Sequence, residues 1–151
     1  MTHDVTLRAA TPADYDGIAA VVDDWWGRPV SHALPRLFLD HFHATSTIAE
    51  ADGALAGFLI GFLSPSRPDA AYIHFVGVHP EHRRGGLARL LYERFFALAA
   101  ADGRTVVRAV TAPANARSIA FHTALGFTVT DPVQGYDGPG DVKVLFERAL
   151  T

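Results

Sequence analysis

The residues at positions 82–88, HRRGGLA, have the types and the spacing of an anion-binding site. Apolar periodicity places them where a strand ends and a long amphipathic helix begins. The first turn of a helix leaves main-chain N–H groups without intrahelical acceptors and carries partial positive charge. Gly85 and Gly86 remove side chains from this turn, and Arg83 and Arg84 can add charge-assisted hydrogen bonds. The sequence therefore predicts a phosphate or pyrophosphate site at this junction.

Composition and motif spacing narrow the expected ligand to one small anion. The net charge of the 151-residue chain is −3 at pH 7, whereas a nucleic-acid-binding surface is basic, so no nucleic acid partner is expected. The junction lacks the lysine and the Ser/Thr of a nucleoside-triphosphate loop. It also does not match the G-x-G-x-x-G pattern of dinucleotide-binding folds.

The elements that hold this junction follow from periodicity and turn signals. Strands are expected over residues 5–10, 46–64 (a hairpin that turns at Asp52-Gly53), 70–79, 105–112, 128–131 and 142–150. Helices are expected over residues 11–26, 34–45, 86–102 and 114–127, the last one ending at Gly126. A glycine-rich loop, PVQGYDGPG, joins the last two strands. This order predicts an α/β fold with a mixed, mostly antiparallel sheet flanked by helices, in a single domain over residues 1–151.

The ordered motifs over residues 72–127 resemble the acetyl-CoA-binding half of GNAT superfamily N-acetyltransferases. Arg83, Gly86 and Ala88 match the pattern R-x-x-G-x-A, between the strand FVGVHP and the helix in EHRRGGLARLLYERF. The strand TVVRAVT and the segment NARSIAFHTALGF follow in the same order. The resemblance implies a GNAT-type fold and an acyltransferase that moves an acetyl group from the co-substrate acetyl-CoA to a primary amine. The acceptor would be a small molecule or a protein, and the amine would attack directly.

The resemblance also implies which residues bind acetyl-CoA. The diphosphate is expected on the main-chain amides of the junction, and the pantetheine arm is expected to pair with an edge of the preceding strand. Two polar residues at the start of the next helix resemble positions that approach the cofactor. The residues expected to bind the cofactor are Val76, Val78, Arg83, Arg84, Gly85, Gly86, Leu87, Ala88, Asn115 and Ser118.

A base must take a proton from the acceptor ammonium before the amine can attack. Related enzymes often carry a glutamate on the strand before the junction, where this chain has Tyr72 and His74. Strand alternation places these two side chains on one face. His74 has suitable basicity at neutral pH and is a candidate base, with Tyr72 beside it as a further catalytic candidate. The alternative is that His74 is a buried, hydrogen-bonded histidine that fills the sheet.

The family often has a tyrosine four residues before the Gly-Phe pair, where this chain has His122. A phenol with a pKa of about 10 is protonated at pH 7, whereas a histidine with a pKa near ~6.5 is mostly neutral. Three interpretations of His122 therefore stay open: a catalytic acid, a hydrogen-bond donor to the cofactor, or an ordinary helix residue.

Two segments are candidates for binding the amine acceptor. In WWGRPV, adjacent tryptophans point to different faces, so one is expected in the core and the other near the acceptor. The glycine-rich loop offers a tyrosine. The predicted acceptor-binding residues are Trp25, Trp26, Arg28 and Tyr136; the alternatives are structural packing for the first segment and a solvated turn for the second. The segment DHFH at residues 40–43 predicts no metal site, because residues two apart do not share a helix face.

The sequence leaves a second class of function open. A non-catalytic acyl-CoA-binding or sensor module would carry the same junction, and the replaced tyrosine and glutamate motivate it. The chain has no cysteine, and its longest apolar run is too short to span a bilayer, so a cytoplasmic protein with no membrane partner is expected. Dimers are common among similar proteins, which leaves a homodimer open.

Overall fold

A computed structural model describes residues 4–150 and divides the chain into two compact units. Unit 1 comprises Met1–Phe62 and Ile73–Leu98, and unit 2 comprises Leu63–Tyr72 and Ala99–Thr151. Residues 1–3 and 151, the ends of the predicted domain, lie outside the described residues. Among residues 4–150, no helix is long and apolar enough to cross a membrane.

Unit 1 is built on a sheet of neighbouring strands, which are β1 (Val5–Ala9), β2 (Thr47–Ala51), β3 (Ala54–Leu63) and the later part of β4 (Ala70–Val78). β1 pairs with β2, and β2 with β3, in antiparallel register. Between β2 and β3, Asp52 and Gly53 have φ angles of 53° and 77°. Positive φ at both central residues is typical of a two-residue hairpin turn, so the predicted turn at Asp52-Gly53 is confirmed.

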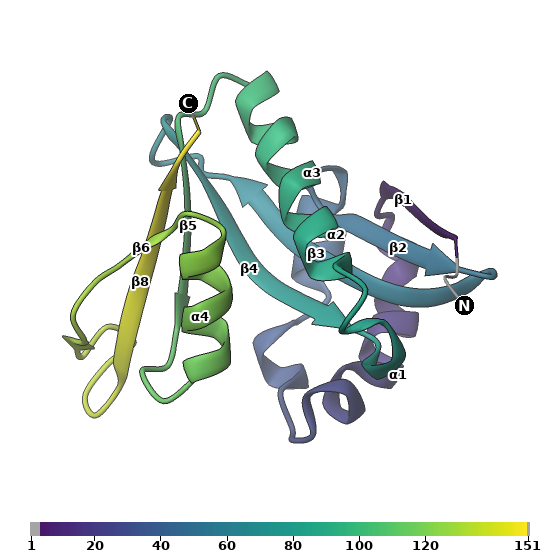
Figure 1. Ribbon diagram of the computed structural model, residues 1–151, viewed down its shortest axis with the longest axis horizontal. Coiled ribbons are helices and arrows are strands. Elements are labelled where there is room, and N and C mark those ends of the chain that lie inside the picture. Colours follow the sequence, from purple (N-terminus) through teal and green to yellow (C-terminus); the bar gives the residue numbers. More distant parts are fainter. Residues whose placement is uncertain (1–3, 151) are drawn as a thin grey trace. The chain divides into compact units, whose positions relative to one another are not determined.

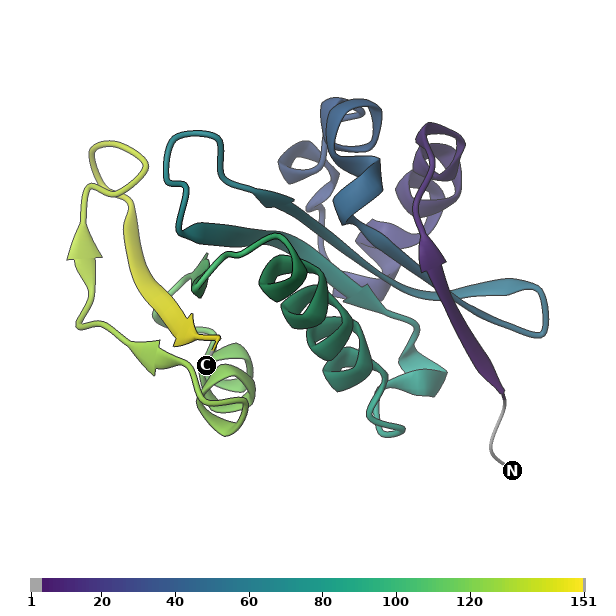
Figure 2. The ribbon, with the colours of Figure 1, turned by 90° about the horizontal axis from the view of Figure 1, so that it is seen from above.

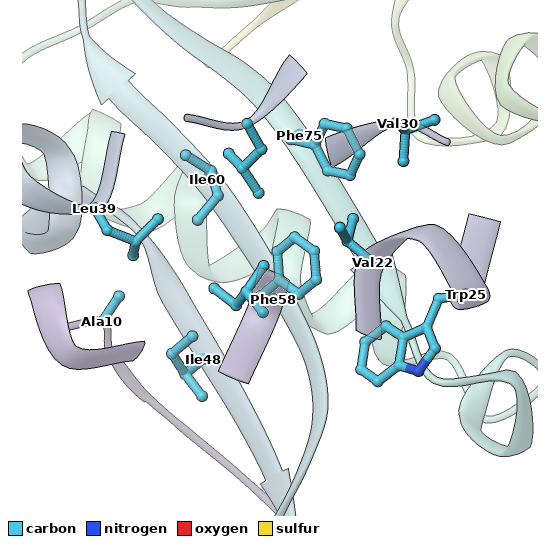
Figure 3. Close-up of a cluster of buried hydrophobic side chains, with 11 residues drawn as sticks. Ala10, Val22, Trp25, Val30, Leu39, Ile48, Phe58, Ile60 and Phe75 are labelled. Carbon is cyan, nitrogen blue, oxygen red and sulfur yellow. The ribbon is translucent and has the colours of Figure 1, made fainter. Parts of the chain in front are cut away.

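Helices cover both faces of this sheet in unit 1, as Figure 2 shows. On one face lie α1 (Tyr15–Trp26) and α2 (Leu37–Phe42), and on the other lies α3 (Leu87–Ala101). The side chains of Trp25, Phe58 and Phe75 lie in the core between the first two helices and the sheet (Figure 3). The Trp25 and Phe58 rings stack with centroids 6.1 Å apart, which fixes the end of α1 against β3.

Two predicted helices are shorter than the sequence indicated. The first begins as a separate 3₁₀ turn, Pro12–Asp14, where the Asp14 carboxylate accepts the Thr11 N–H at 2.7 Å. The second ends at Phe42, whose φ of −125° leaves the helical region, and a 3₁₀ turn follows. Side-chain capping therefore sets the start of the first helix, and the rotated backbone at Phe42 sets the end of the second. Neither feature changes the apolar periodicity from which the helices were predicted.

Two glycines allow close packing on the strands that precede α3, one toward α3 and the other toward the core beneath α1. A Cβ atom at Gly77 in β4 would lie 2.5 Å from the Phe58 ring, and a Cβ atom at Gly57 in β3 would lie 3.2 Å from a Leu87 methyl group. Because real Cβ atoms do not come as close as the first of these distances, only glycine fits at position 77. Gly57 thus lets Leu87 at the start of α3 pack directly on β3, whereas Gly77 makes room for the Phe58 ring that stacks on Trp25.

Unit 2 contains the first residues of β4, together with β5 (Val106–Thr111), β6 (Thr128–Val129), β7 (Val133–Gln134), β8 (Val142–Ala149) and α4 (Ala116–Ala124). β4 and β5 are parallel, whereas β8 pairs antiparallel with β5, β6 and β7. Figure 1 shows α4 beside β5 and β8. The predicted α/β class with a mixed, mostly antiparallel sheet is confirmed, and so is Gly126 as a left-handed residue (φ 90°) after α4. The short strand β7 lies within the segment predicted as a loop.

Candidate functional site

The junction between β4 and α3 has an open helix start. The Leu90 N–H donates to the Gly86 carbonyl at 3.1 Å, so the N–H groups of residues 86–89 have no acceptor inside the helix. Gly86 has a φ of 77°, and a Cβ atom built on it would meet open space. Main-chain donors, a helix dipole and an unobstructed approach are therefore combined at Gly86, which is the geometry that binds a phosphate group.

The two arginines of the junction differ in their contacts. Nη2 of Arg83 donates to the carbonyl of Trp25, and its Nε donates to the carbonyl of Val78 at 3.3 Å. Since Trp25 lies in the last turn of α1, this cation also faces the negative end of that helix dipole. Arg84 is exposed and has no hydrogen bond or ion pair within residues 4–150. Arg83 therefore connects three segments of unit 1, and Arg84 is the arginine that a bound anion can reach.

Within residues 4–150, the later part of β4 has no strand partner on the edge that points away from β3, next to this junction. Its register with β5 covers only Ala70–Tyr72. On its other edge it follows β3 as far as the hydrogen bond from the His79 N–H to the Ala56 carbonyl, 2.8 Å. Because main-chain groups alternate between the two edges of a strand, those of Val76 and Val78 point away from β3. Apart from the Val78 carbonyl, which contacts Arg83, these groups can pair with an extended ligand.

His74 is half-buried in unit 1. Its Nε2–H donates to the Ala33 carbonyl at 2.6 Å, and its ring stacks on Phe38 with centroids 4.0 Å apart and planes 5° apart. Burial lowers the pKa of His74, and the hydrogen bond to Ala33 acts in the opposite direction. The imidazole is therefore neutral at pH 7, and its Nδ1 carries the lone pair.

His122 is buried in unit 2, with 6% of its surface exposed. Its ring stacks on Phe146 with centroids 4.0 Å apart and planes 4° apart, and Phe127 contacts it edge-on at 5.0 Å. Nδ1–H donates to the Ser118 carbonyl at 2.7 Å. Burial lowers the pKa of His122, as it does for His74. A largely buried, neutral ring in an aromatic cluster has the contacts expected of a packed helix residue.

Asn115 and Ser118 form the start of α4. The Ser118 N–H donates to Asn115 Oδ1 at 3.2 Å, so Asn115 is the N-cap of this helix. The Asn115 amide also donates to Thr111 Oγ1 at 3.2 Å. These two predicted cofactor-binding residues therefore complete the hydrogen bonds of their own helix turn.

Tyr72 is half-buried in unit 2, near the loop that contains Tyr136. Burial, followed by the charges of Tyr136 and Asp137, raises the pKa of Tyr72 to about 12. Its phenol stays protonated at neutral pH and can donate a proton or a hydrogen bond. Tyr136 itself is 44% exposed.

The tryptophans of WWGRPV separate as predicted into one core residue and one accessible residue. Trp25 is 8% exposed, whereas Trp26 is 37% exposed and contacts Phe75 at 5.1 Å between centroids. The Arg28 guanidinium lies 5.8 Å from the Trp26 ring. Trp26 and Arg28 thus form an accessible aromatic and cationic pair at the end of α1.

The structure groups the predicted site residues by unit. Unit 1 contains the predicted residues of the junction, the β4 edge and the end of α1, which are His74, Val76, Val78, Arg83, Arg84, Gly85, Gly86, Leu87, Ala88, Trp25, Trp26 and Arg28. Unit 2 contains Tyr72, Asn115, Ser118, His122 and Tyr136. Among residues 4–150, no group of three or more His, Asp or Glu side chains could hold a metal ion.

The sequence model of the acetyltransferase (GNAT) family matches residues 15–127, which include the junction, the β4 edge and α4. The chain belongs to the GNAT family. The predicted resemblance is therefore confirmed, and its match extends past the motif region into α1 at the N-terminal end.

Characterised GNAT relatives include acetyltransferases of amino acids. The chain is 34% identical over 89 residues to the L-2,4-diaminobutyric acid acetyltransferase of Nocardia farcinica, covering 59% of this chain and 46% of that protein. It is 46% identical over 57 residues to the L-methionine sulfoximine/L-methionine sulfone acetyltransferase of Salmonella typhimurium, covering 38% and 33%. The chain thus spans less than half the length of either relative.

The fold is also that of solved GNAT structures. Diaminobutyrate acetyltransferase from Paenibacillus lautus, solved with L-2,4-diaminobutyric acid and coenzyme A, superposes with a TM-score of 0.78 at 22% identity. The alignment covers 99% of this chain and 98% of that one. At this identity the likeness shows the shared fold.

Some contacts of this GNAT site have no signal in the sequence. Arg83 and the Trp25 carbonyl are 58 residues apart, and His74 and the Ala33 carbonyl are 41 residues apart. Main-chain acceptors leave no pattern in side-chain types, so neither bond could have been predicted. The cap at Asn115 did have a signal, because asparagine before a helix is a preferred N-cap.

Proposed function

We propose that this GNAT-family protein transfers an acetyl group from acetyl-CoA to a primary amine of a free amino acid. The open start of α3 at Gly86, next to the unpaired edge of β4, is the observation that carries the proposal. The amino-acid acceptors named for the relatives from Nocardia farcinica and Salmonella typhimurium support the acceptor class.

The residues at the junction fit the cofactor. The open main-chain N–H groups at the start of α3, those of residues 86–88, are donors for the diphosphate, with Arg84 as an exposed cation beside them. The edge groups of Val76 and the Val78 N–H are donors and acceptors for the amides of the pantetheine arm. Acetyl-CoA supplies the acetyl group as a thioester. Arg83 donates hydrogen bonds to the carbonyls of Trp25 and Val78, so its proposed role is to stabilise the conformation of the junction.

His74 is the proposed base for the acceptor ammonium. The hydrogen bond to Ala33 fixes the tautomer and leaves the lone pair on Nδ1, and the lowered pKa keeps this nitrogen unprotonated at pH 7. Tyr72, with a pKa of about 12, keeps its proton and is the proposed proton donor. The contacts of His122 support a packing role over an acid role, and those of Trp25 support a core role.

Two measurements test this function. Titration calorimetry should show binding of acetyl-CoA and of CoA, and no heat at millimolar ligand would remove the proposal. A thiol-release assay over a panel of amines, with mass detection of the acetylated product, should then identify turnover with amino-acid acceptors. Tight cofactor binding without turnover of any amine would instead support the acyl-CoA sensor.

A further inference from the structure

Arg108 in β5 is a partly exposed cation whose hydrogen-bonding capacity is unused. Its side chain is 34% exposed, yet its Nε atom is buried and makes no hydrogen bond. Glu147 Oε2 lies 3.2 Å from this Nε, which is an ion-pair contact without hydrogen-bond alignment. No other hydrogen bond of the guanidinium occurs within residues 4–150. A buried donor without a hydrogen bond is unusual and calls for a partner.

The register of unit 2 places Arg108 on the sheet face opposite α4. Phe146, which stacks on His122 of α4, is paired with Ala109. Arg108 is one residue away and is paired with Glu147, so its side chain points to the other face. On the β4 side, Arg108 is paired with Tyr72.

The residues near Tyr72 and Arg108 make this face selective for a polar ligand. Tyr136 and Asp137 act electrostatically on the Tyr72 hydroxyl, so the loop that carries them lies close to it. The nearby ammonium of Lys143 is already paired with Asp141 and with Asp137, at 3.5 Å from the latter. Among the described residues, Arg108 has only the ion-pair contact with the exposed Glu147, so its guanidinium N–H groups keep their hydrogen-bonding capacity for a ligand on this face.

The geometry points to Arg108 as the residue that recognises the carboxylate of the acceptor amino acid, on a face of unit 2 that also carries the Tyr72 hydroxyl. This inference rests on the proposed function and names the feature that separates an amino-acid acceptor from a simple amine. A guanidinium presents paired N–H donors that match the two oxygens of a carboxylate. Glu147 is 55% exposed, so it can move into solvent when a ligand carboxylate takes its place.

The test compares an amino acid with its decarboxylated counterpart in the presence of CoA, where no turnover occurs. The first pair is 2,4-diaminobutyrate and 1,3-diaminopropane, and the second is methionine sulfone and 3-(methylsulfonyl)propylamine. Calorimetry on the full chain should show tighter binding of the amino acid in at least one pair. Arg108→Gln should lower the affinity for that amino acid by roughly tenfold to a hundredfold, as expected for loss of a charge-assisted hydrogen bond. The affinity for the corresponding amine should not fall.

Two further variants separate recognition from a structural ion pair. Glu147→Gln removes the same ion pair and should leave the preference for the amino acid intact or increase it. Arg108→Lys keeps the charge but loses the planar fork, and should restore part of the affinity. The CoA affinity and the unfolding midpoint of each variant report whether the fold is retained.

The outcomes distinguish this inference from the proposed function. Equal binding of amino acid and amine by the wild type would overturn the role of Arg108, as would an unchanged preference in Arg108→Gln or equal effects of Arg108→Gln and Glu147→Gln. Absence of amino-acid binding would overturn it too. In each of these cases, thiol release with any other amine would leave the acetyltransferase function standing, whereas failure of thiol release with every amine would remove that function.

Discussion

Each unit contains a turn that leads from a strand into a helix, and the two turns treat the helix start in opposite ways. In unit 1, the turn from β4 to α3 ends in Gly86, and no side chain of the described part of the chain caps the N–H groups that follow. In unit 2, the turn from β5 to α4 ends in Asn115, whose side chain accepts the Ser118 N–H. The first helix start is available to a ligand, whereas the second is satisfied by its own chain.

A helix start alone does not define an anion site. Both helices follow a strand of the same chain, but only one start combines open donors with open space. The two histidines that stack on phenylalanine rings also differ in how far each is enclosed by its own unit. His74 lies half-buried with its Nδ1 lone pair unprotonated, whereas His122 is enclosed by Phe127 and Phe146.

The two helix starts should differ most when a carboxylate is placed at each of them. Gly86→Asp should weaken CoA binding by more than ~100-fold, because like charges next to one another cost several kcal/mol. Ala116→Asp adds the same charge at the first residue of α4 and should leave CoA binding unchanged. Calorimetry with CoA measures both, with the unfolding midpoint as a check on folding. Equal affinity of Gly86→Asp and the wild type would show that the diphosphate binds elsewhere.

The next largest effect concerns the two histidines. His74→Gln can still donate to the Ala33 carbonyl but provides no base, so kcat should fall by roughly 100-fold, the lower range for loss of a general base. His122→Gln should keep kcat close to that of the wild type and lower the unfolding midpoint, because the stack on Phe146 is lost. Steady-state thiol release with a responsive amine gives kcat. A larger loss of kcat in His122→Gln than in His74→Gln would reverse the assignment.

The sequence alone predicted most features of the turn from β4 to α3, and fewer features of the turn from β5 to α4. Glycines, arginines and the following amphipathic periodicity mark the β4–α3 junction, because backbone access and charge depend on residue type. The sequence also placed Asn115 at the start of a helix, but it did not show whether its side chain would face a ligand or its own backbone. Whether Asn115 faces a ligand or its own backbone depends on the rotamer of its side chain. The role of Arg83 depends on a carbonyl 58 residues away, which no residue type reveals.

Asn115→Ala tests the second turn directly. Loss of the N-cap should lower the free energy of unfolding by about 1 kcal/mol, measured by urea denaturation, and should leave the CoA affinity unchanged. Ser118→Ala is the matched control, because its N–H, which is the group that Asn115 caps, is retained. A weaker CoA affinity in Asn115→Ala with unchanged stability would mean that Asn115 binds the cofactor, as the resemblance implies.

The smallest expected effect is the pH dependence of stability that the two histidines share. Burial lowers the pKa of both His74 and His122 in the folded state below the value of about 6.5 expected when unfolded. The unfolded state therefore binds more protons as the pH falls, so the stabilising contribution is present above pH ~6.5 and is lost toward the lowered folded pKa. Between pH 7 and pH 6 each histidine should account for at most about 0.7 kcal/mol of lost stability. Urea unfolding of His74→Gln and His122→Gln at both pH values should show a smaller loss than the wild type. An undiminished loss in either variant would mean that this histidine takes up its proton equally well in the folded and unfolded states.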